Sequence, residues 1–132
     1  MEAVLGKDLF SRLHGDDWRN YQARSVIDTI SDPRHHAWVA EHRSEICGFA
    51  AAGVVDPYRG LGEVTMLAVD PAHQAQGVGL ALTDHATEWL RSHGMRVAMI
   101  GTGGDLGHAQ ARRLYERAGY SLMPMARYFK AL

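Results

Sequence analysis

The sequence of 132 residues has one cysteine, four prolines and a net charge of only −1. A single cysteine, Cys47, excludes an internal disulfide framework and is typical of a reducing compartment, so we expect the protein in the cytoplasm. No apolar run approaches the roughly 18 residues of a membrane-spanning helix, and the N-terminus lacks the pattern of a signal peptide. The near-zero charge argues against nucleic-acid binding. We therefore expect neither a membrane nor a nucleic acid as partner.

The chain also lacks repeats, low-complexity tracts and long linkers. Its 46% hydrophobic and 22% charged residues are typical of a globular protein. We therefore expect one domain over residues 1–132. The eight histidines include no H-E-x-x-H pattern, and we interpret them as scattered surface residues. His35 and His36 follow Pro33 in a predicted loop. No metal site is expected, and Cys47 is predicted to be a small core residue.

The hydrophobic period changes along the chain from helical spacing to strand-like spacing and back. Strand 62–69, helix 76–92 and strand 96–100 predict a parallel strand–helix–strand unit. The preceding strands, joined at Arg43-Ser44, predict an antiparallel hairpin. The fold class is therefore α/β with a mixed sheet. The predicted elements are helices 2–13 and 17–30, strands 36–42, 45–55 and 62–69, helix 76–92, strand 96–100, helix 108–118, and two strands within 120–132.

Two glycines, Gly77 and Gly79, stand where strand 62–69 leads into helix 76–92 within HQAQGVGLAL. The first turn of a helix has free backbone N–H groups and a partial positive charge, which together favour an anion. Glycine leaves room for a phosphate and permits positive φ. The alternative is that these glycines only allow close packing of helix on sheet. No Gly-Lys-Ser/Thr is present, which excludes a P-loop, and GTGGDLG at 101–107 has too little chain after it for a dinucleotide fold.

In combination, these motifs resemble the GNAT superfamily of N-acetyltransferases. EVTMLAVDP followed by HQAQGVGLAL is similar to that family's acyl-CoA segment, with Gln74, Gly77 and Gly79 at its R/Q-x-x-G-x-G/A positions. ARRLYERAGY at 111–120 is similar to the segment that follows. The resemblance implies a mixed, mostly antiparallel sheet with a central parallel β-α-β acyl-CoA unit. The family's first β-strand has no room ahead of helix 2–13, and an uncovered sheet edge would favour a homodimer.

The resemblance further implies acetyl-CoA as cosubstrate. Its pyrophosphate would lie on the amides of residues 76–80, and its pantetheine arm would pair with the strand around residues 67–69. His108 occupies the position of a family asparagine that contacts the pantetheine or the thiol. The alternatives are a histidine that acts as base and a histidine that faces solvent at the helix N-terminus. The implied cofactor-binding residues are Leu67, Ala68, Val69, Gln74, Ala75, Gln76, Gly77, Val78, Gly79, Leu80 and His108.

The same resemblance implies two catalytic residues. Tyr115 matches the family's tyrosine, and a phenol stays protonated at neutral pH and can give a proton to the leaving sulfur; the alternative is a core tyrosine. Glu63 is a candidate base, with a solvent-facing glutamate and ordered water as alternatives. A backbone N–H near Leu67 would stabilise the oxyanion.

The predicted function is therefore direct acetyl transfer, in a ternary complex, to a primary amine of a small-molecule or peptide acceptor. The alternative is a non-catalytic acyl-CoA sensor or a protein-interaction module with the same fold.

Overall fold

The computed structural model describes residues 24, 27–29, 31–102, 104 and 106–132. The predicted helix 2–13, most of the predicted helix 17–30 and the question of a first β-strand lie outside the described residues. Residues 24, 27–29 and 31 are helical, and the chain then turns at residues 32–34. Among the described residues, no helix has the length and apolar character needed to cross a bilayer.

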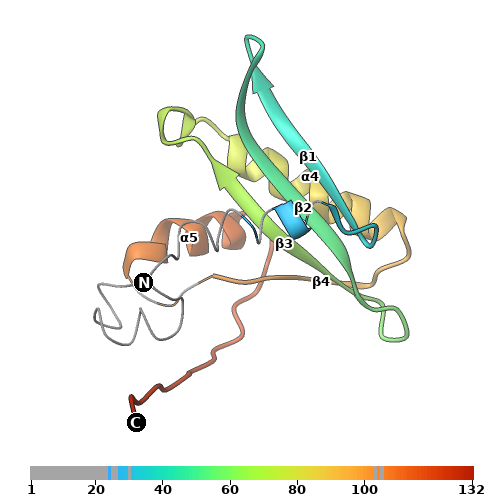
Figure 1. Cartoon of the computed structure of the whole chain (residues 1–132), viewed down its shortest axis with the longest axis vertical. Coiled ribbons are helices and arrows are strands. Elements are labelled where there is room, and N and C mark those ends of the chain that lie inside the picture. Colours follow the sequence, from blue (N-terminus) through green and yellow to red (C-terminus); the bar gives the residue numbers. More distant parts are fainter. Residues whose placement is uncertain (1–23, 25–26, 30, 103, 105) are drawn as a thin grey trace.

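Four strands form a sheet in the order β1-β2-β3-β4 (Figure 1). They are β1 (His35–His42), β2 (Glu45–Asp56), β3 (Leu61–Val69) and β4 (Val97–Ile100). β1–β2 and β2–β3 pair antiparallel, whereas β3 and β4 are parallel. The predicted mixed, mostly antiparallel sheet is confirmed. The sequence suggested that His35 and His36 lie in a loop. They instead begin β1, where they pair with Gly53 and Ala52 of β2.

The hairpin between β1 and β2 turns at Arg43 and Ser44, whose φ angles are 51° and 68°. Positive φ at both central residues matches the right-handed twist of the strands, so a two-residue loop suffices. Cys47 lies just inside β2, is buried as predicted, and its thiol donates to the Ala40 carbonyl oxygen at 3.4 Å.

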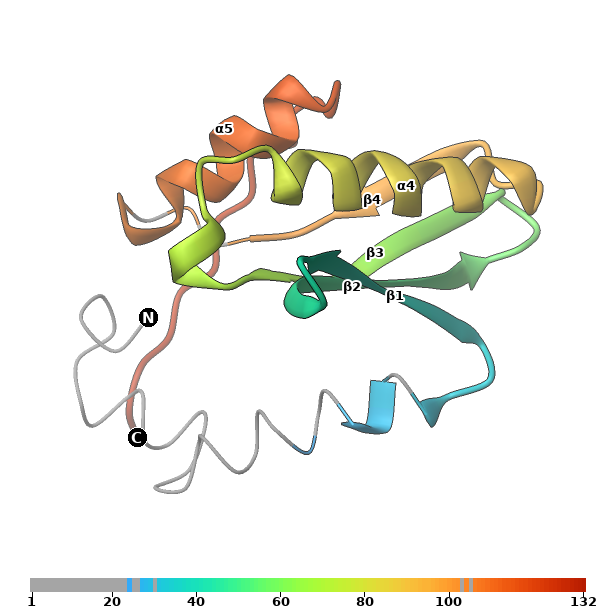
Figure 2. The same ribbon diagram turned by 90° about the horizontal axis from the view of Figure 1, so that it is seen from above.

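Helix α4 (Val78–Ser92), which comes between β3 and β4 in the chain, packs on one face of the sheet over β2 and β3, and α5 (Ala109–Arg117) lies on the same side (Figure 2). Two short 3-10 turns, η1 (Pro71–His73) and η2 (Leu106–His108), precede these helices. The apolar stripe of α4 packs on small residues of the sheet, which lets the helix approach closely. The buried core cluster is Ala50, Ala52, Val64, Leu82, Ala86 and Leu90.

A β-bulge in β3 separates its two halves. Val64 pairs with Ala52 and Met66 pairs with Ala51, so Thr65 is an extra residue, and its hydroxyl donates to the Ala51 carbonyl at 3.2 Å. An extra residue reverses which alternate side chains face a given side. Accordingly, Val64 faces α4 before the bulge, and Leu67 and Val69 pack against the same core after it.

The two strands predicted within residues 120–132 are absent: no strand is found there. Apolar side chains of this segment, including Leu122, Met123 and Met125, are exposed. Aromatic and other apolar residues form a strand only where a neighbouring strand accepts the backbone hydrogen bonds. β4, at the edge of the sheet, has only four residues and pairs with β3 alone among the described strands.

Candidate functional site

The loop between β3 and α4 brings the predicted phosphate-binding residues together. Asp70 caps η1 by accepting a hydrogen bond from the Ala72 amide at 2.9 Å. The chain then passes through two left-handed residues, Ala75 at φ 62° and Gly77 at φ 83°, before α4 begins. Ala75 is a non-glycine residue in a conformation that L-residues seldom adopt, so the loop stores strain at this point.

The first turn of α4 presents free amides. Its first intrahelical bond is from the Ala81 N–H to the Gly77 carbonyl, at 3.0 Å, and Gly77 provides no side-chain cap. The amides of Val78, Gly79 and Leu80 therefore precede the helical ladder. The first turn contains no acidic residue. The helix end is thus electropositive and suited to an anion.

Gly77 and Gly79 are required for different reasons. A Cβ on Gly77 would meet nothing within 4 Å, so close packing does not require glycine at this position. The φ of 83° favours glycine there, and the space around it is open to a ligand. A Cβ on Gly79 would lie 3.0 Å from Leu114 Cδ2 of α5, a contact tighter than ordinary van der Waals packing. The anion interpretation therefore suits Gly77, and the packing interpretation suits Gly79.

Next to this loop, β3 and β4 part. Their pairing covers only Leu61 to Val64 on β3, and it ends where Val64 meets Ile100. β3 continues to Val69, still paired with β2 on its other side. Beyond the bulge at Thr65, the β4-facing edge of β3 has no strand partner in the described part of the chain. Backbone groups around Leu67, Ala68 and Val69 can therefore accept an extended ligand arm that leads to the first turn of α4.

Helix α5, which contains Tyr115, lies on the α4 side of the sheet (Figure 2). Its C-terminal end is joined to α4 by the hydroxyls of Tyr120 and Thr87, 2.6 Å apart, and the Tyr120 amide donates to the Tyr115 carbonyl at 3.0 Å. Burial, followed by the neighbouring Tyr120, raises the pKa of Tyr115 above its ordinary value of 10.0. The phenol thus keeps its proton at neutral pH, as a general acid must.

Glu63 lies on the opposite side of the sheet. Its neighbours Gly62 and Val64 face α4: a Cβ on Gly62 would lie 2.5 Å from Leu90 Cδ2. Glu63 alternates with them, is half-buried, and is paired with Gly53 of β2 and Met99 of β4. The structure therefore places Glu63 and α5 on opposite sides of the sheet. Glu63 lies one residue before Val64, where the pairing of β3 with β4 ends.

His108 is the N-cap residue of α5, with no side-chain cap hydrogen bond to the helix. His108 thus stands at the start of α5, and its contact with the ligand arm stays a prediction. Arg112 lies one turn further along the same helix. Among the described residues, no group of three or more His, Cys, Asp or Glu is arranged to hold a metal ion.

Sequence reasoning missed Thr65, whose bulge separates the two halves of β3. A β-branched residue inside a strand-like run carries no local signal of a bulge, because the extra residue is defined only by pairing with β2. It also missed a group of histidines between β1 and α4, described below.

Comparison with known proteins places this geometry in a family. The sequence profile of the Acetyltransferase (GNAT) family matches residues 6–120. A mycothiol acetyltransferase of Amycolatopsis mediterranei is 31% identical over 118 residues, covering 80% of this chain and 38% of the relative. One of Beutenbergia cavernae is 33% identical over 84 residues, covering 64% and 28%. The chain thus spans less than half the length of these relatives.

Solved structures share the fold. A GNAT-family protein of Desulfovibrio desulfuricans has a TM-score of 0.69 at 26% identity, covering 83% of this chain and 70% of that one. An acetyltransferase of Bacillus subtilis in complex with CoA has a TM-score of 0.68 at 22% identity, covering 78% and 64%. An aminoglycoside acetyltransferase from a soil metagenome, in complex with sisomicin, has a TM-score of 0.67 at 17% identity, covering 99% and 88%.

Proposed function

Because the chain belongs to the GNAT family of acetyltransferases, we propose that it transfers the acetyl group of acetyl-CoA to a primary amine of a small molecule, by direct transfer in a ternary complex. The observation that carries this proposal is the parting of β3 from β4 beside the uncapped N-terminus of α4. One feature suits an extended pantetheine arm, and the other suits a pyrophosphate at the end of that arm.

The residues present fit acetyl-CoA. The free amides of Val78, Gly79 and Leu80 would hold the pyrophosphate, and the open space around Gly77 leaves room for it. Gln74 and the left-handed Ala75 shape the loop, and the Gln74 side chain donates to the Val69 carbonyl at 3.4 Å. The unpaired edge of β3 at residues 67–69 would hydrogen-bond the pantetheine amides, as an added strand does.

When bound, acetyl-CoA supplies the activated acetyl thioester. The Leu67 backbone N–H stabilises negative charge on the thioester oxygen. Tyr115 holds a proton at its phenol oxygen, ready for the sulfur that departs as the new C–N bond forms. On the other side of the sheet, Glu63 accepts the proton that the attacking amine loses, directly or through a water molecule. A base and an acid on opposite sides of the gap between β3 and β4 suit an acceptor that enters from the side opposite α4.

The acceptor class is proposed from the relatives. Two of the similar proteins are called mycothiol acetyltransferase and aminoglycoside acetyltransferase, and both names refer to a small molecule. The chain covers only 38% of the first of these relatives. Their names therefore indicate a chemical class of acceptor for this chain and not one particular acceptor. We propose a small-molecule amine of the amino-sugar type.

Calorimetric titration with acetyl-CoA, compared with CoA, tests the cosubstrate. Saturable binding is expected, and a folded sample that binds neither ligand would contradict the proposal. A thiol-release assay with a panel of amino sugars and polyamines then tests transfer. Tight acetyl-CoA binding without thiol release for any amine would favour a non-catalytic acyl-CoA sensor instead.

A further inference from the structure

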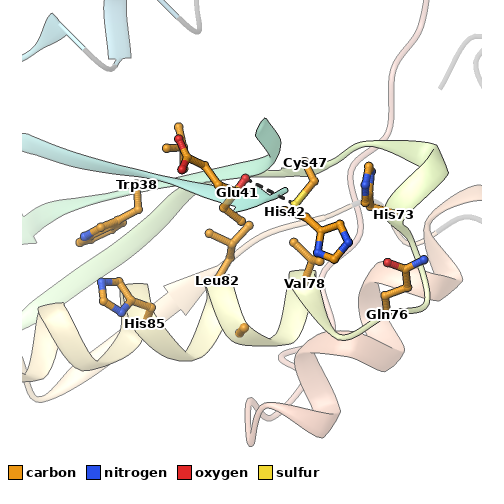
Figure 3. Close-up of a pocket in the computed structure, with 12 residues that line it drawn as sticks. Trp38, Glu41, His42, Cys47, His73, Gln76, Val78, Leu82 and His85 are labelled. Carbon is orange, nitrogen blue, oxygen red and sulfur yellow. Dashed lines mark hydrogen bonds between the residues drawn. The ribbon is translucent and has the colours of Figure 1, made fainter. Parts of the chain in front are cut away.

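A pocket of about 480 Å³ lies between β1 and the first half of α4 (Figure 3). β1 and β4 are opposite edges of the sheet, so this pocket lies at the far edge from the gap between β3 and β4. It adjoins the phosphate-binding loop through Gln76 and Val78, which line the pocket. It is therefore separate from the proposed pantetheine path but in contact with the loop at its end.

One end of the pocket is an aromatic wall formed by Trp38. The indole contacts His85 edge-on, with ring centroids 5.3 Å apart, and Trp89 in the same manner at 5.6 Å. These contacts hold the indole in one orientation before any ligand arrives. A pre-oriented flat surface lowers the entropy cost of binding another aromatic ring.

The other end is polar. The rings of His42 and His73 lie in a T-shaped arrangement, with centroids 5.9 Å apart, and the Gln76 amide lies beside them (Figure 3). An imidazole and a carboxamide each offer both a hydrogen-bond donor and an acceptor. The buried Nδ1 of His73 is 4.0 Å from Asp70 Oδ2, beyond hydrogen-bond range, and has no hydrogen-bond partner among the described residues. No such bond therefore fixes the tautomer of His73, so Nε2 can donate or accept.

The charged side chains that line the pocket indicate which class of ligand it can bind. Among the described residues that line the pocket there is no Lys or Arg, and the Glu41 carboxylate points away from α4 (Figure 3). A phosphate or carboxylate would therefore meet no cationic side chain among these described residues. Between the two ends the floor is apolar, formed by Val78, Ala81 and Leu82. The lining therefore suits an uncharged molecule with a flat ring at one end and hydrogen-bond donors and acceptors at the other.

We propose that this pocket binds an uncharged nucleoside, beside acetyl-CoA and separate from it. The base packs against Trp38 at one end, and the ribose hydroxyls reach the other end to bond with His42, His73 and Gln76. An imidazole or a carboxamide can donate a hydrogen bond to a hydroxyl or accept one from it. Because Gln76 belongs to the phosphate-binding loop, occupancy of the pocket changes the affinity for acetyl-CoA. This coupling rests on the proposed function, whereas the site itself does not.

The test is calorimetric titration of the full chain with adenosine, guanosine, cytidine and uridine. We expect saturable binding of at least one nucleoside. His42→Ala should weaken it about tenfold, the effect of losing one hydrogen bond. His93→Ala is the matched control, because His93 is also exposed but stacks on Trp89, at 4.1 Å, outside the pocket. Circular dichroism checks that both variants are folded.

Three results would overturn the proposal: no binding of any of the four nucleosides, equal binding by wild type and His42→Ala, or an apparent nucleoside Kd that rises without limit as the acetyl-CoA concentration increases. The last would show that acetyl-CoA and the nucleoside compete for one site, whereas coupling through Gln76 levels off once acetyl-CoA saturates its own site. Nucleoside binding that persists in a protein unable to bind acetyl-CoA would support the site while contradicting the proposed function, so the two failures are distinguishable.

Discussion

Replacing Gly77 with alanine separates the conformation of the phosphate-binding loop from the stability of the fold. Gly77 has a φ of 83°, and a Cβ there would contact nothing within 4 Å. The cost is therefore conformational, about 1–2 kcal/mol for an L-residue in the left-handed region. The unfolded chain with alanine has less entropy, which offsets roughly 0.4–1 kcal/mol of that cost. A net loss of about 1 kcal/mol should lower Tm by about 4 °C.

The protein provides a matched control at the other end of the same helix. Gly94 has a φ of 85° and equally open surroundings, but it follows the C-terminus of α4, far from the free amides. Gly94→Ala should lose about the same stability. Only Gly77→Ala should weaken acetyl-CoA binding, by about tenfold or more, because a relaxed loop no longer aims the amides of Val78 to Leu80 at the pyrophosphate.

Thermal unfolding measures the stability of each variant, and calorimetric titration measures its affinity for acetyl-CoA. If both variants lose stability and both bind acetyl-CoA as tightly as the wild type, the loop conformation has no part in cosubstrate binding. The assignment of the free amides to the pyrophosphate would then be wrong. If Gly94→Ala weakens binding as much as Gly77→Ala, the effect arises from general loosening of α4.

Three further predictions address other parts of the structure. Tyr115→Phe should lower kcat about 100-fold with little change in acetyl-CoA affinity, and should abolish any fall in kcat above pH 10; an unchanged kcat would exclude the phenol as acid. Asp32 accepts hydrogen bonds from Arg34, which lowers its pKa from 3.8 to about 2. The stabilisation by Asp32 is thus present above pH 3.8 and lost as the pH falls through about 2. Arg34→Ala should return the pKa toward 3.8, measurable by NMR of the carboxyl carbon, and a pKa still near 2 would contradict this pairing. Thr87→Val removes the 2.6 Å bond to Tyr120 and should cost about 1 kcal/mol of unfolding free energy, with no additional loss in the double variant with Tyr120→Phe.

The parts of the fold that the sequence predicted well are those encoded by local signals. The strand–helix–strand unit was found because the apolar period changes at Gly77 and again after Ser92. The hairpin was found because Arg43-Ser44 lies between two alternating runs. The predicted start of α4 at Gln76 was two residues early, since the left-handed Gly77 keeps it outside the helix.

The parts that failed depend on partners distant in sequence. The tail at 120–132 has aromatic and other apolar residues, yet no neighbouring strand pairs with it in the described structure. The bulge at Thr65 exists only relative to Ala51 and Ala52. His42, His73 and His85 come from β1, η1 and α4, so no spacing along the chain could have grouped them.

The bulge at Thr65 explains how one strand can serve both the core and the site. Without an extra residue, strict alternation would direct Leu67 and Val69 to the side opposite Val64, and the core beneath α4 would lose them. With it, Val64 before the bulge and Leu67 and Val69 after it all pack in the core beneath α4. The bulge also lies just past the last residue that pairs with β4, and a bulge increases local twist and bends the strand. The same extra residue thus keeps the core continuous and marks the point where β3 leaves β4. The packing that stabilises the domain and the gap proposed for the pantetheine arm therefore depend on a single local feature of β3.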